Sequence, residues 1–345
     1  MKIAVDAMGG DFAPQKIVEG AVLAAREYQT PIILVGKKNV IVAELAKHDT
    51  KNLPIFIEHA SDIIEMHESP SKASRYKQDS SIVVATRLVA QGKADAVVSA
   101  GNSGAVMTSA LRYLGRIPGV YRPMIATIIP TQKGSCLVAD AGANTDCKPE
   151  YLLQFAIMSK IAAETILNIS QPRVGLLSIG EEKEKGSALT KRAFPLLESC
   201  PYIKFIGNVE GRDIPKGTAD VIICDGFVGN VVLKTIEGTA ESIQRMIKTI
   251  ICSSLVAKIG FLCMRHLFKN LKKKLDYAEY GGAPLLGVKG TCIIAHGKSS
   301  AKAMKNAIRV AQQCVHQRIN DEIRIEIENP KTHYAPPPDL IHGRP

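Results

Sequence analysis

Six short polar turns, each following a run of apolar residues, combine glycine with acidic, amide, basic or imidazole side chains. They occupy residues 6–11 (DAMGGD), 100–104 (AGNSG), 140–144 (DAGAN), 180–186 (GEEKEKG), 225–230 (DGFVGN) and 296–297 (HG). Glycine allows close approach of the backbone to a ligand, and the N–H groups of tight turns bind anions. One glycine after a strand is ordinary turn chemistry, but six such turns favour a site for an anion with several oxygen atoms.

The polar side chains and glycines of these turns are the candidate substrate-binding residues. The set is Asp6, Gly9, Gly10, Gly101, Asn102, Ser103, Gly104, Asp140, Asn144, Lys183, Gly229 and His296. A second basic stretch, residues 69–81 (SPSKASRYKQDSS), adds Arg75 shortly before Ser80 and Ser81. The two serines fit a helix N-cap, and a helix start beside an arginine fits an anion site, so the sequence supports both interpretations.

Several familiar catalytic motifs are absent from the sequence. It has neither GxGxxG nor GxxxxGK followed by Ser or Thr, which argues against a dinucleotide or ATP site. It has no GxSxG elbow, no cysteine with recognisable His and Asn partners, and no HExxH, so covalent or metal catalysis has no visible carrier. If the anion is the nucleophile, N–H groups with Asn, Asp and Lys suffice to place phosphate against a carbonyl and to stabilise the oxyanion. We therefore expect no cofactor, no metal, no acyl-enzyme and dispensable cysteines.

Apolar runs rich in valine and isoleucine alternate with helical patterns along the chain. The ten runs are residues 3–5, 32–35, 55–57, 96–99, 126–129, 136–139, 174–179, 204–206, 221–224 and 292–295. Continuous apolar strands that alternate with helices indicate a mostly parallel sheet buried on both faces. The predicted fold is a doubly wound, three-layer α/β/α domain, in which the polar turns gather at the carboxyl ends of the strands along one edge.

The composition is that of a globular protein, with 46% hydrophobic and 22% charged residues in a chain of 345. We expect a single catalytic α/β domain over residues 1–329 and a proline-rich tail over residues 330–345. The eight cysteines are spaced without a CxxC pair, and the N-terminus is predicted to be a strand rather than a signal peptide. These features indicate a cytoplasmic protein without disulfides or a zinc site.

The net charge of +11 and a pI near 9.2 suggest an acidic partner. The absence of tryptophan and the low aromatic content of 5% argue against nucleic acid. Residues 246–274 belong to a predicted helical segment, 246–282, and have apolar side chains at helical spacing. They carry too many charges for a transmembrane helix. The segment fits an interfacial amphipathic helix or hairpin, and equally a helix pair in a dimer interface or a core.

Taken together, the motifs resemble the bacterial phosphate acyltransferase family, also called acyl carrier protein:phosphate transacylases. The matching segments are IAVDAMGGDFAP at 3–14, ASRYKQDSS at 73–81, VSAGNSGA at 98–105, DAGAN at 140–144, LSIGEEKEKG at 177–186, FIGNVEGRD at 205–213, DGFVGNVVLKTIEG at 225–238, YGGAPLLGVKG at 280–290 and AHG at 295–297. They follow one another in the order expected for that family and cover most of the chain.

The resemblance implies transfer of a fatty acyl group from acyl carrier protein to inorganic phosphate. The acyl phosphate would then serve a membrane glycerol-3-phosphate acyltransferase in phospholipid synthesis. The resemblance also implies a cytoplasmic homodimer attached peripherally to the anionic inner face of the membrane, with a fold similar to that of phosphotransacetylases and the isocitrate dehydrogenase group. Asn230 carries over as a catalytic residue, with Asp225 beside it. A catalytic lysine before glycine also carries over and falls on Lys185, with Lys183 two positions earlier as the alternative.

Two alternatives remain open from the sequence. One is a phosphotransacetylase that acts on a short acyl-CoA, which would share the nucleophile and the fold. The other is a non-catalytic scaffold that recruits lipid enzymes to a membrane through the basic helical segment, although the intact polar turns argue against loss of catalysis. A decarboxylating dehydrogenase of similar fold would need a nicotinamide site and metal-binding aspartates, which the sequence does not show.

Overall fold

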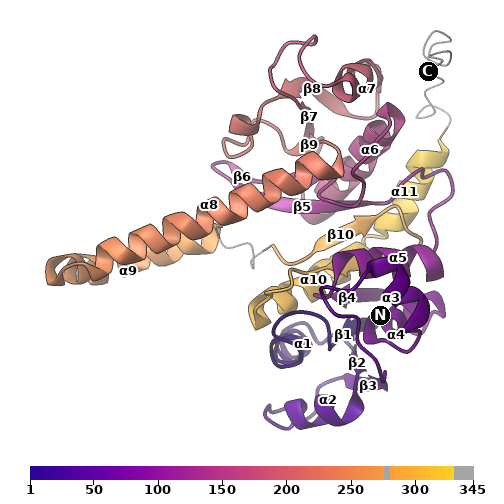
Figure 1. Cartoon of the computed structure of the whole chain (residues 1–345), viewed down its shortest axis with the longest axis vertical. Coiled ribbons are helices and arrows are strands. Elements are labelled where there is room, and N and C mark those ends of the chain that lie inside the picture. The colour runs from indigo at the N-terminus through magenta and orange to yellow at the C-terminus, as the bar shows by residue number, and fades with distance from the viewer. Residues whose placement is uncertain (276–279, 330–345) are drawn as a thin grey trace.

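The computed structural model describes residues 1–275 and 280–329 as one α/β body from which a long helical hairpin extends (Figure 1). Residues 276–279, inside the segment 246–282, lie outside the described residues, and so does the predicted tail 330–345. All six polar turns lie within the described residues.

Eleven strands form a single sheet in the described part of the chain, in the order β3-β2-β1-β4-β11-β10-β5-β6-β9-β7-β8. They are β1 (Ile3–Asp6), β2 (Ile32–Gly36), β3 (Ile55–His59), β4 (Ala96–Ser99), β5 (Met124–Thr131), β6 (Gly134–Ala139), β7 (Arg173–Leu177), β8 (Lys204–Val209), β9 (Val221–Ile223), β10 (Ala283–Leu286) and β11 (Thr291–Ile294). Their apolar side chains alternate between clusters on the two faces, since Ile3 and Val5 join one cluster and Ala4 joins the other.

Helices cover both faces of the sheet and give the predicted three layers. They are α1 (Gln15–Tyr28), α2 (Lys38–Leu45), α3 (Pro70–Tyr76), α4 (Ser81–Ala90), α5 (Ser103–Tyr113), α6 (Pro149–Ile166), α7 (Ala188–Glu198), α8 (Gly226–Cys252), α9 (Leu255–Leu275), α10 (Ala301–His316), α11 (Ile319–Glu328) and a short 3-10 turn, Gly211–Asp213. Helices α1, α6, α7, α10 and α11 share one apolar cluster with the sheet, whereas α4 and α5 pack into the cluster on the other face. The predicted α/β/α fold with a mostly parallel sheet is therefore confirmed.

The sheet consists of two parallel blocks joined by antiparallel strands. Strands β1 to β4 pair with one another and with β11 in parallel, and β6 to β9 form a second parallel block. Between the blocks, β10 is antiparallel to β11 and to β5, and β5 is antiparallel to β6. Three antiparallel steps reverse the direction, so the two blocks run in opposite senses. The expectation that all polar turns share one edge is therefore wrong, because three belong to each block.

The ten predicted strands are all present, with ends within a few residues of the predicted ones. The strand missed by the sequence analysis is β10, whose sequence is APLL. It follows Gly281 and Gly282 and contains Pro284, a composition typical of a loop. Its buried position between two antiparallel neighbours overrides that local signal.

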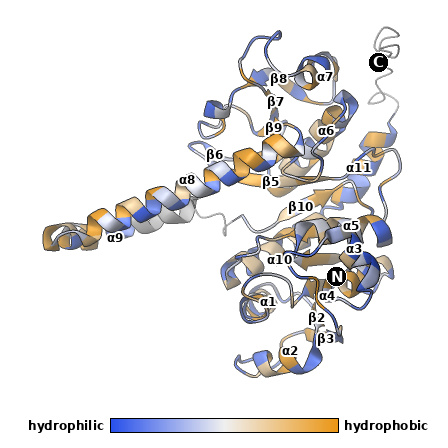
Figure 2. Cartoon of the chain, viewed as in Figure 1, coloured by the Kyte–Doolittle hydropathy of each residue, from blue (hydrophilic) through white to orange (hydrophobic). Residues whose placement is uncertain are grey.

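Helices α8 and α9 form the hairpin, and α8 alone is about 40 Å long at 1.5 Å per residue (Figure 1). Ser254 begins α9, because its Oγ accepts a hydrogen bond from the N–H of Ala257 at 3.0 Å. Large apolar side chains on the hairpin are 46–81% exposed: Ile243, Met246, Ile250, Leu255, Val256, Ile259, Leu262 and Met264. They form part of the apolar coloration along the projecting helices in Figure 2. The hairpin is therefore not a core element of this chain. In the described residues, no helix is both long and apolar enough to cross a bilayer.

One ion pair ties the second block together and gives a pH-dependent stability. The N–H and Nε of Arg173 donate to Asp220 Oδ2 at 2.8 and 2.9 Å, and a terminal guanidinium nitrogen donates to Oδ1 at 2.9 Å. Burial alone would raise the pKa of Asp220, but the hydrogen bonds and charge of Arg173 hold that pKa below its ordinary value of 3.8. The stability from this pair is therefore present above the ordinary pKa and is lost as pH falls through the lowered one.

Asp220→Asn should lower the free energy of unfolding by about 1–2 kcal/mol at neutral pH, since it removes a charged, multiply bonded acceptor that is partly screened by solvent. The loss should shrink at about pH 3, where the wild-type carboxylate also begins to take up a proton. Urea denaturation at both pH values measures it. Glu241→Gln is the control. It breaks an ion pair in which the side chains of Glu241 and Arg245 are 63% and 79% exposed, so it should change the free energy of unfolding little. An equal loss from Asp220→Asn at both pH values would contradict this account.

Candidate functional site

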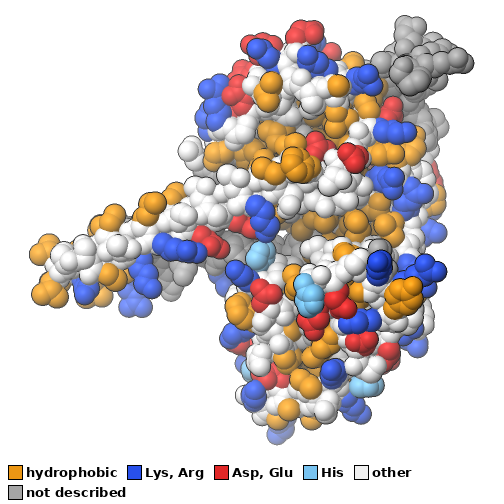
Figure 3. All heavy atoms as spheres, viewed as in Figure 1, with side chains coloured by type: hydrophobic (Ala, Val, Ile, Leu, Met, Phe, Trp, Pro, Cys, Tyr) orange, Lys and Arg blue, Asp and Glu red, His pale blue; other side chains and the backbone are white. Residues whose placement is uncertain are grey.

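The polar turns form two groups, one in each block of the sheet. The turns after β1, β4 and β11 belong to the first block, and those after β6, β9 and β7 belong to the second. Helix α8 begins in the second group and passes toward the first, with a hollow below it between the two halves of the body (Figure 3). The candidate site is this region along α8.

In the first group, Asp6 is a buried organiser of its own turn, with its side chain 2% exposed. Its carboxylate accepts hydrogen bonds from the Ser99 hydroxyl at 2.7 Å and the Met8 N–H at 3.2 Å. The Ser81 side chain and the Gly9 N–H also donate to it. Burial raises the pKa of Asp6, and these donors oppose that shift. The carboxylate therefore joins the end of β1 to β4 and to the start of α4.

The glycines of the first group are required for close packing of the three turns. A Cβ on Gly9 would lie 2.8 Å from the Gly101 nitrogen, and Gly10 has a φ of +108°. The carbonyl of Gly297, next to His296, accepts the N–H of Asp11 at 2.8 Å. These residues bring the turns after β1, β4 and β11 into contact, as expected from the sequence.

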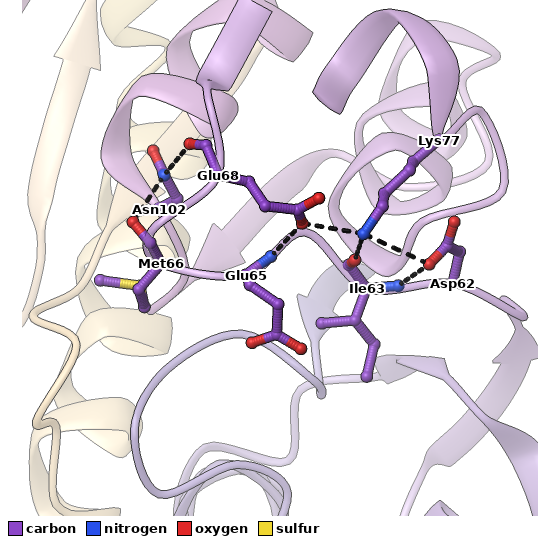
Figure 4. Close-up of polar contacts among 7 residues, drawn as sticks. All are labelled: Asp62, Ile63, Glu65, Met66, Glu68, Lys77 and Asn102. Carbon is purple, nitrogen blue, oxygen red and sulfur yellow. Dashed lines mark hydrogen bonds and ion pairs between the residues drawn. The ribbon is translucent and has the colours of Figure 1, made fainter. Parts of the chain in front are cut away.

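Asn102 caps α5 and anchors the segment that precedes α3 (Figure 4). Its Oδ1 accepts the Ala105 N–H at 3.1 Å, and its Nδ2 donates to the carbonyls of Met66 and Glu68 at 3.0 and 3.2 Å. The same segment is held by Lys77, whose Nζ donates to Glu68 Oε2 at 2.8 Å. This hydrogen bond is the main reason why the pKa of Glu68 is lowered. The side chains of Asn102 and Lys77 are thus engaged in holding the loop.

Two other residues of this region carry groups that no described residue engages. Ser103, the first residue of α5, is exposed, and neither its hydroxyl nor its N–H is hydrogen-bonded within the described part of the chain. Arg75 is exposed on α3, which packs against α5 where Pro70 meets Gly104. The start of α5 can therefore bind an anion, and Arg75 lies on the neighbouring helix.

In the second group, Asp140 is the buried residue that organises its turn, as Asp6 does in the first group. Its side chain is 0% exposed. Its carboxylate accepts five hydrogen bonds of 2.7–3.3 Å, from the N–H groups of Ile125, Gly142, Ala143 and Asn144 and from the Asn144 side chain. Asn144 also donates to the carbonyl of Pro123 at 2.8 Å. Burial raises the pKa of Asp140, and the hydrogen bonds from Ile125, Ala143 and Asn144 oppose that shift. The carboxylate fixes the shape of the turn 140–144.

The start of α8 packs directly on this turn. Asp225 caps the helix, since its Oδ1 accepts the Val228 N–H at 2.9 Å. The N–H of Gly226 donates to the carbonyl of Asn144 at 2.7 Å. A Cβ on Gly229 would lie 1.9 Å from the carbonyl oxygen of Asp140, so only glycine fits there. The DGFVGN motif thus allows the start of α8 to pack against the turn after β6.

Asn230 follows Gly229 and faces the same turn. Its Cβ and Oδ1 lie 3.6 and 3.8 Å from the point where a Cβ on Gly142 would be. The residue is exposed, and its amide has no hydrogen-bond partner among the residues that the structure describes. The side chain of Asn230 is therefore available to a ligand.

The structure distinguishes the two candidate lysines after β7. Lys183 pairs with Glu198 on α7 and lies 5.2 Å above the Phe194 ring. Lys185 is exposed, and its ammonium group contacts no acidic side chain in the described residues. Its carbonyl accepts the Ser178 hydroxyl at 3.1 Å, which closes the turn before Gly186. Of the two ammonium groups, that of Lys185 is the one without an ion pair in the described part of the chain.

Comparison with known proteins decides the family. A family model described as "Fatty acid synthesis protein" matches residues 1–322. A phosphate acyltransferase from Geobacter sulfurreducens is 51% identical over 341 residues, which cover 99% of this chain and 98% of that relative. One from Dictyoglomus turgidum is 53% identical over 324 residues, covering 94% and 96%. The chain belongs to the phosphate acyltransferase family.

Solved structures with the same fold include phosphotransacetylases. One from Streptococcus pyogenes has a TM-score of 0.61 at 18% identity and covers 92% of this chain and 94% of its own. A branched-chain phosphotransacylase from Enterococcus faecalis has a TM-score of 0.58 at 17% identity, with 92% and 99% covered. These likenesses show the fold predicted for this phosphate acyltransferase.

Two residues of the site were not singled out by the sequence analysis. Lys234 and Glu237 follow Asn230 by four and seven positions on α8, and Lys234 Nζ donates to Glu237 Oε2 at 2.7 Å. Glu237 Oε2 also lies 3.9 Å from Nε2 of His296, the residue after β11. The helical spacing from Asn230 was the signal available in the sequence.

The thiols beside the second group of turns offer little nucleophilic character. All eight cysteines are free. Two thiols lie against the second group: Cys147 Sγ is 3.6 Å from the carbonyl of Asn144, and Cys224 Sγ is 3.7 Å from the carbonyl of Asp140. Burial raises the pKa of both, that of Cys147 to about 12. A thiol with such a pKa is almost entirely protonated near neutral pH. Among the described residues, no cluster of three His, Cys, Asp or Glu side chains could hold a metal ion.

Proposed function

We propose that this phosphate acyltransferase moves a fatty acyl group from acyl carrier protein to inorganic phosphate. The observation that carries the proposal is the free amide of Asn230 near the start of α8, beside a turn fixed by the buried Asp140. A donor held by rigid neighbours is preorganised for the charge that develops in acyl transfer.

The reaction needs positioning and charge stabilisation rather than a covalent intermediate. A phosphate oxygen attacks the thioester carbonyl, the C–O bond forms, and the C–S bond breaks to release the thiolate, which takes a proton from solvent. In this proposal Asn230 donates to phosphate or to the oxyanion, and Lys185 supplies the counter-charge. Asp225 acts through α8, because it caps the helix that presents Asn230.

The proposed partners are inferred from the net charge of the chain and from its family. The chain carries a net charge of +11, which suits an acidic carrier protein and would make association sensitive to salt. The acyl phosphate product would be consumed by a membrane glycerol-3-phosphate acyltransferase in phospholipid synthesis. A cytoplasmic homodimer that attaches peripherally to the inner membrane face would deliver it there.

Purified protein should convert a long-chain acyl carrier thioester in the presence of phosphate with a kcat/KM far above that for acetyl-CoA. Both substrates should be assayed at the same phosphate concentration with thiol release as the readout. A higher kcat/KM for acetyl-CoA would show a short-chain phosphotransacetylase, and no turnover of either would favour the non-catalytic scaffold.

We propose further that the tip of the hairpin contacts an anionic membrane. Leu255, Val256, Ile259 and Leu262 are 64–81% exposed around the turn between α8 and α9, and Lys258 and Arg265 are exposed beside them. Exposed apolar side chains flanked by basic ones suit an interfacial helix pair. Each basic residue near an anionic surface adds about 1 kcal/mol of attraction, which salt screens.

Replacing Leu255, Ile259 and Leu262 together with glutamine should release the protein from anionic vesicles in a sedimentation assay. Soluble activity and dimer formation should stay largely intact, because the three residues belong to the first half of α9, whereas Asn230 lies near the start of α8. The two helices meet at the end of the hairpin away from the body (Figure 1). Phe56→Gln, on an edge strand with 52% of the residue exposed, is the control and should not affect vesicle binding. If wild type shows no binding to anionic vesicles and the triple variant dissociates the dimer, the hairpin is a dimer contact instead.

A further inference from the structure

The face of α8 that carries Asn230 continues as a polar stripe through Lys234 to Glu237. Residues four and seven positions apart lie on one side of a helix. At one end of the stripe, Asn230 faces the turn after β6, and at the other end Glu237 Oε2 lies 3.9 Å from His296 Nε2 after β11. Lys234 therefore stands between the two groups of polar turns.

The neighbours of Lys234 hold its ammonium group at this place. Its Nζ donates to Glu237 Oε2 at 2.7 Å, and the Lys234 side chain is 55% exposed. The N–H of Lys298 donates to His296 Nδ1 at 3.1 Å, so neutral His296 carries its hydrogen on Nε2, toward Glu237. Glu237 is thus oriented between a cation and an imidazole N–H. In Figure 3, basic, acidic and histidine side chains meet where α8 passes the lower half.

The pair of Lys234 and Glu237 contributes little to helix stability. An exposed ion pair on a helix contributes only a few tenths of a kcal/mol, and the favourable order places the acid N-terminal to the base. Here the lysine precedes the glutamate. An ammonium group has three donors, and Glu237 is the one hydrogen-bond partner of Lys234 in the described residues, so donors remain available to an oxyanion.

We propose that Lys234 binds a phosphate group in the site and that its ammonium group pairs with Glu237 when no anion is bound. The chemistry recognised is a phosphate oxyanion, either the inorganic phosphate that accepts the acyl group or a phosphodiester in the prosthetic arm of the carrier. This inference rests on the proposed function and deepens it by assigning a binding residue. Lys234 joins Asn230 and Lys185 as a third donor, and it is the one nearest the first group of turns.

The test measures phosphate affinity in Lys234→Met, Lys234→Arg and Glu237→Gln. Lys47→Met is the matched control, because Lys47, two residues after the outer helix α2, makes a similar pair at 2.6 Å and three-residue spacing with Glu44 of that helix. For each variant, the KM for inorganic phosphate and the KM for the carrier thioester are determined. Calorimetric titration with inorganic phosphate gives a binding constant that does not depend on turnover, and the thermal midpoint checks folding.

Lys234→Met should raise one of the two KM values about tenfold or more, with a smaller change in kcat, because it removes one charge-assisted hydrogen bond. Lys234→Arg should retain most of the affinity. A rise in the KM and the calorimetric Kd for inorganic phosphate identifies the acceptor as the ligand, and a rise confined to the thioester KM identifies the carrier phosphodiester. Glu237→Gln should leave affinity equal or tighter, since it removes a nearby negative charge.

The inference is overturned if Lys234→Met changes both KM values and the phosphate Kd by no more than the Lys47→Met control does. It is also overturned if Glu237→Gln weakens binding as much as Lys234→Met, since the pair would then act only by shaping α8. Absence of acyl transfer in wild type would refute the proposed function, whereas calorimetry would still decide whether Lys234 binds inorganic phosphate.

Discussion

Asn230→Ala should lower kcat/KM by about 100-fold or more in a protein that still folds, because it removes a preorganised donor from the charge that develops in the transition state. Its amide is exposed and makes no hydrogen bond to the described residues, so little folding energy should be lost. Lys185→Met should cause a loss of the same order through the counter-charge on phosphate. Steady-state rates with acyl carrier thioester and phosphate measure both effects.

Two control variants separate these roles from general effects of the substitutions. Asn39→Ala removes an exposed asparagine from the first turn of the outer helix α2 and should leave the rate unchanged. Lys183→Met should cost far less than Lys185→Met, because Lys183 is held by Glu198. Near-normal turnover of both Asn230→Ala and Lys185→Met would show that the catalytic assignment is incorrect.

Gly229→Ala should abolish most activity although Asn230 is still present. The new Cβ would lie 1.9 Å from the carbonyl oxygen of Asp140, where no atom can fit. That oxygen belongs to a turn fixed by five hydrogen bonds to the Asp140 carboxylate, so the start of α8 must shift instead. We expect a loss of about 2–3 kcal/mol in the free energy of unfolding from overpacking, together with a large fall in kcat.

Gly238→Ala on the same helix is the matched control, because a Cβ there meets nothing within 4 Å. It should stabilise α8 by up to about 1 kcal/mol, since alanine has the higher helix propensity. Denaturant unfolding and turnover should be measured for both variants. Wild-type stability and activity in Gly229→Ala would contradict the close seating of α8 on the turn after β6.

The strands and layers were predictable because their signal is local. Runs such as residues 96–99 are continuously apolar and end in glycine turns, and the predicted strand coincides with β4. The reversed direction of the second block was not predictable, because it depends on β10 and β5, which pair across a long sequence separation. Because the reversal could not be predicted, all polar turns were expected along one edge of the sheet.

The sequence identified many residues of the site, but it did not show what each side chain does. Residue type and spacing indicated Asp6, Asp140 and Asn102, but burial and hydrogen bonds show that their side chains shape loops. A sequence cannot reveal that a carboxylate is 0% or 2% exposed, because burial depends on the packing of distant segments. The choice between Lys183 and Lys185 likewise depended on Glu198, which lies on the next helix.

Consumption of a long-chain acyl carrier thioester with and without inorganic phosphate tests the central claim most directly. The free carrier thiol and the acyl phosphate should be quantified in the same reaction. The account predicts that carrier thiol and acyl phosphate appear in equal amounts when phosphate is present, and that neither forms when it is omitted. Thiol release at the same rate without phosphate, or an acyl group retained on the protein, would contradict direct transfer to phosphate.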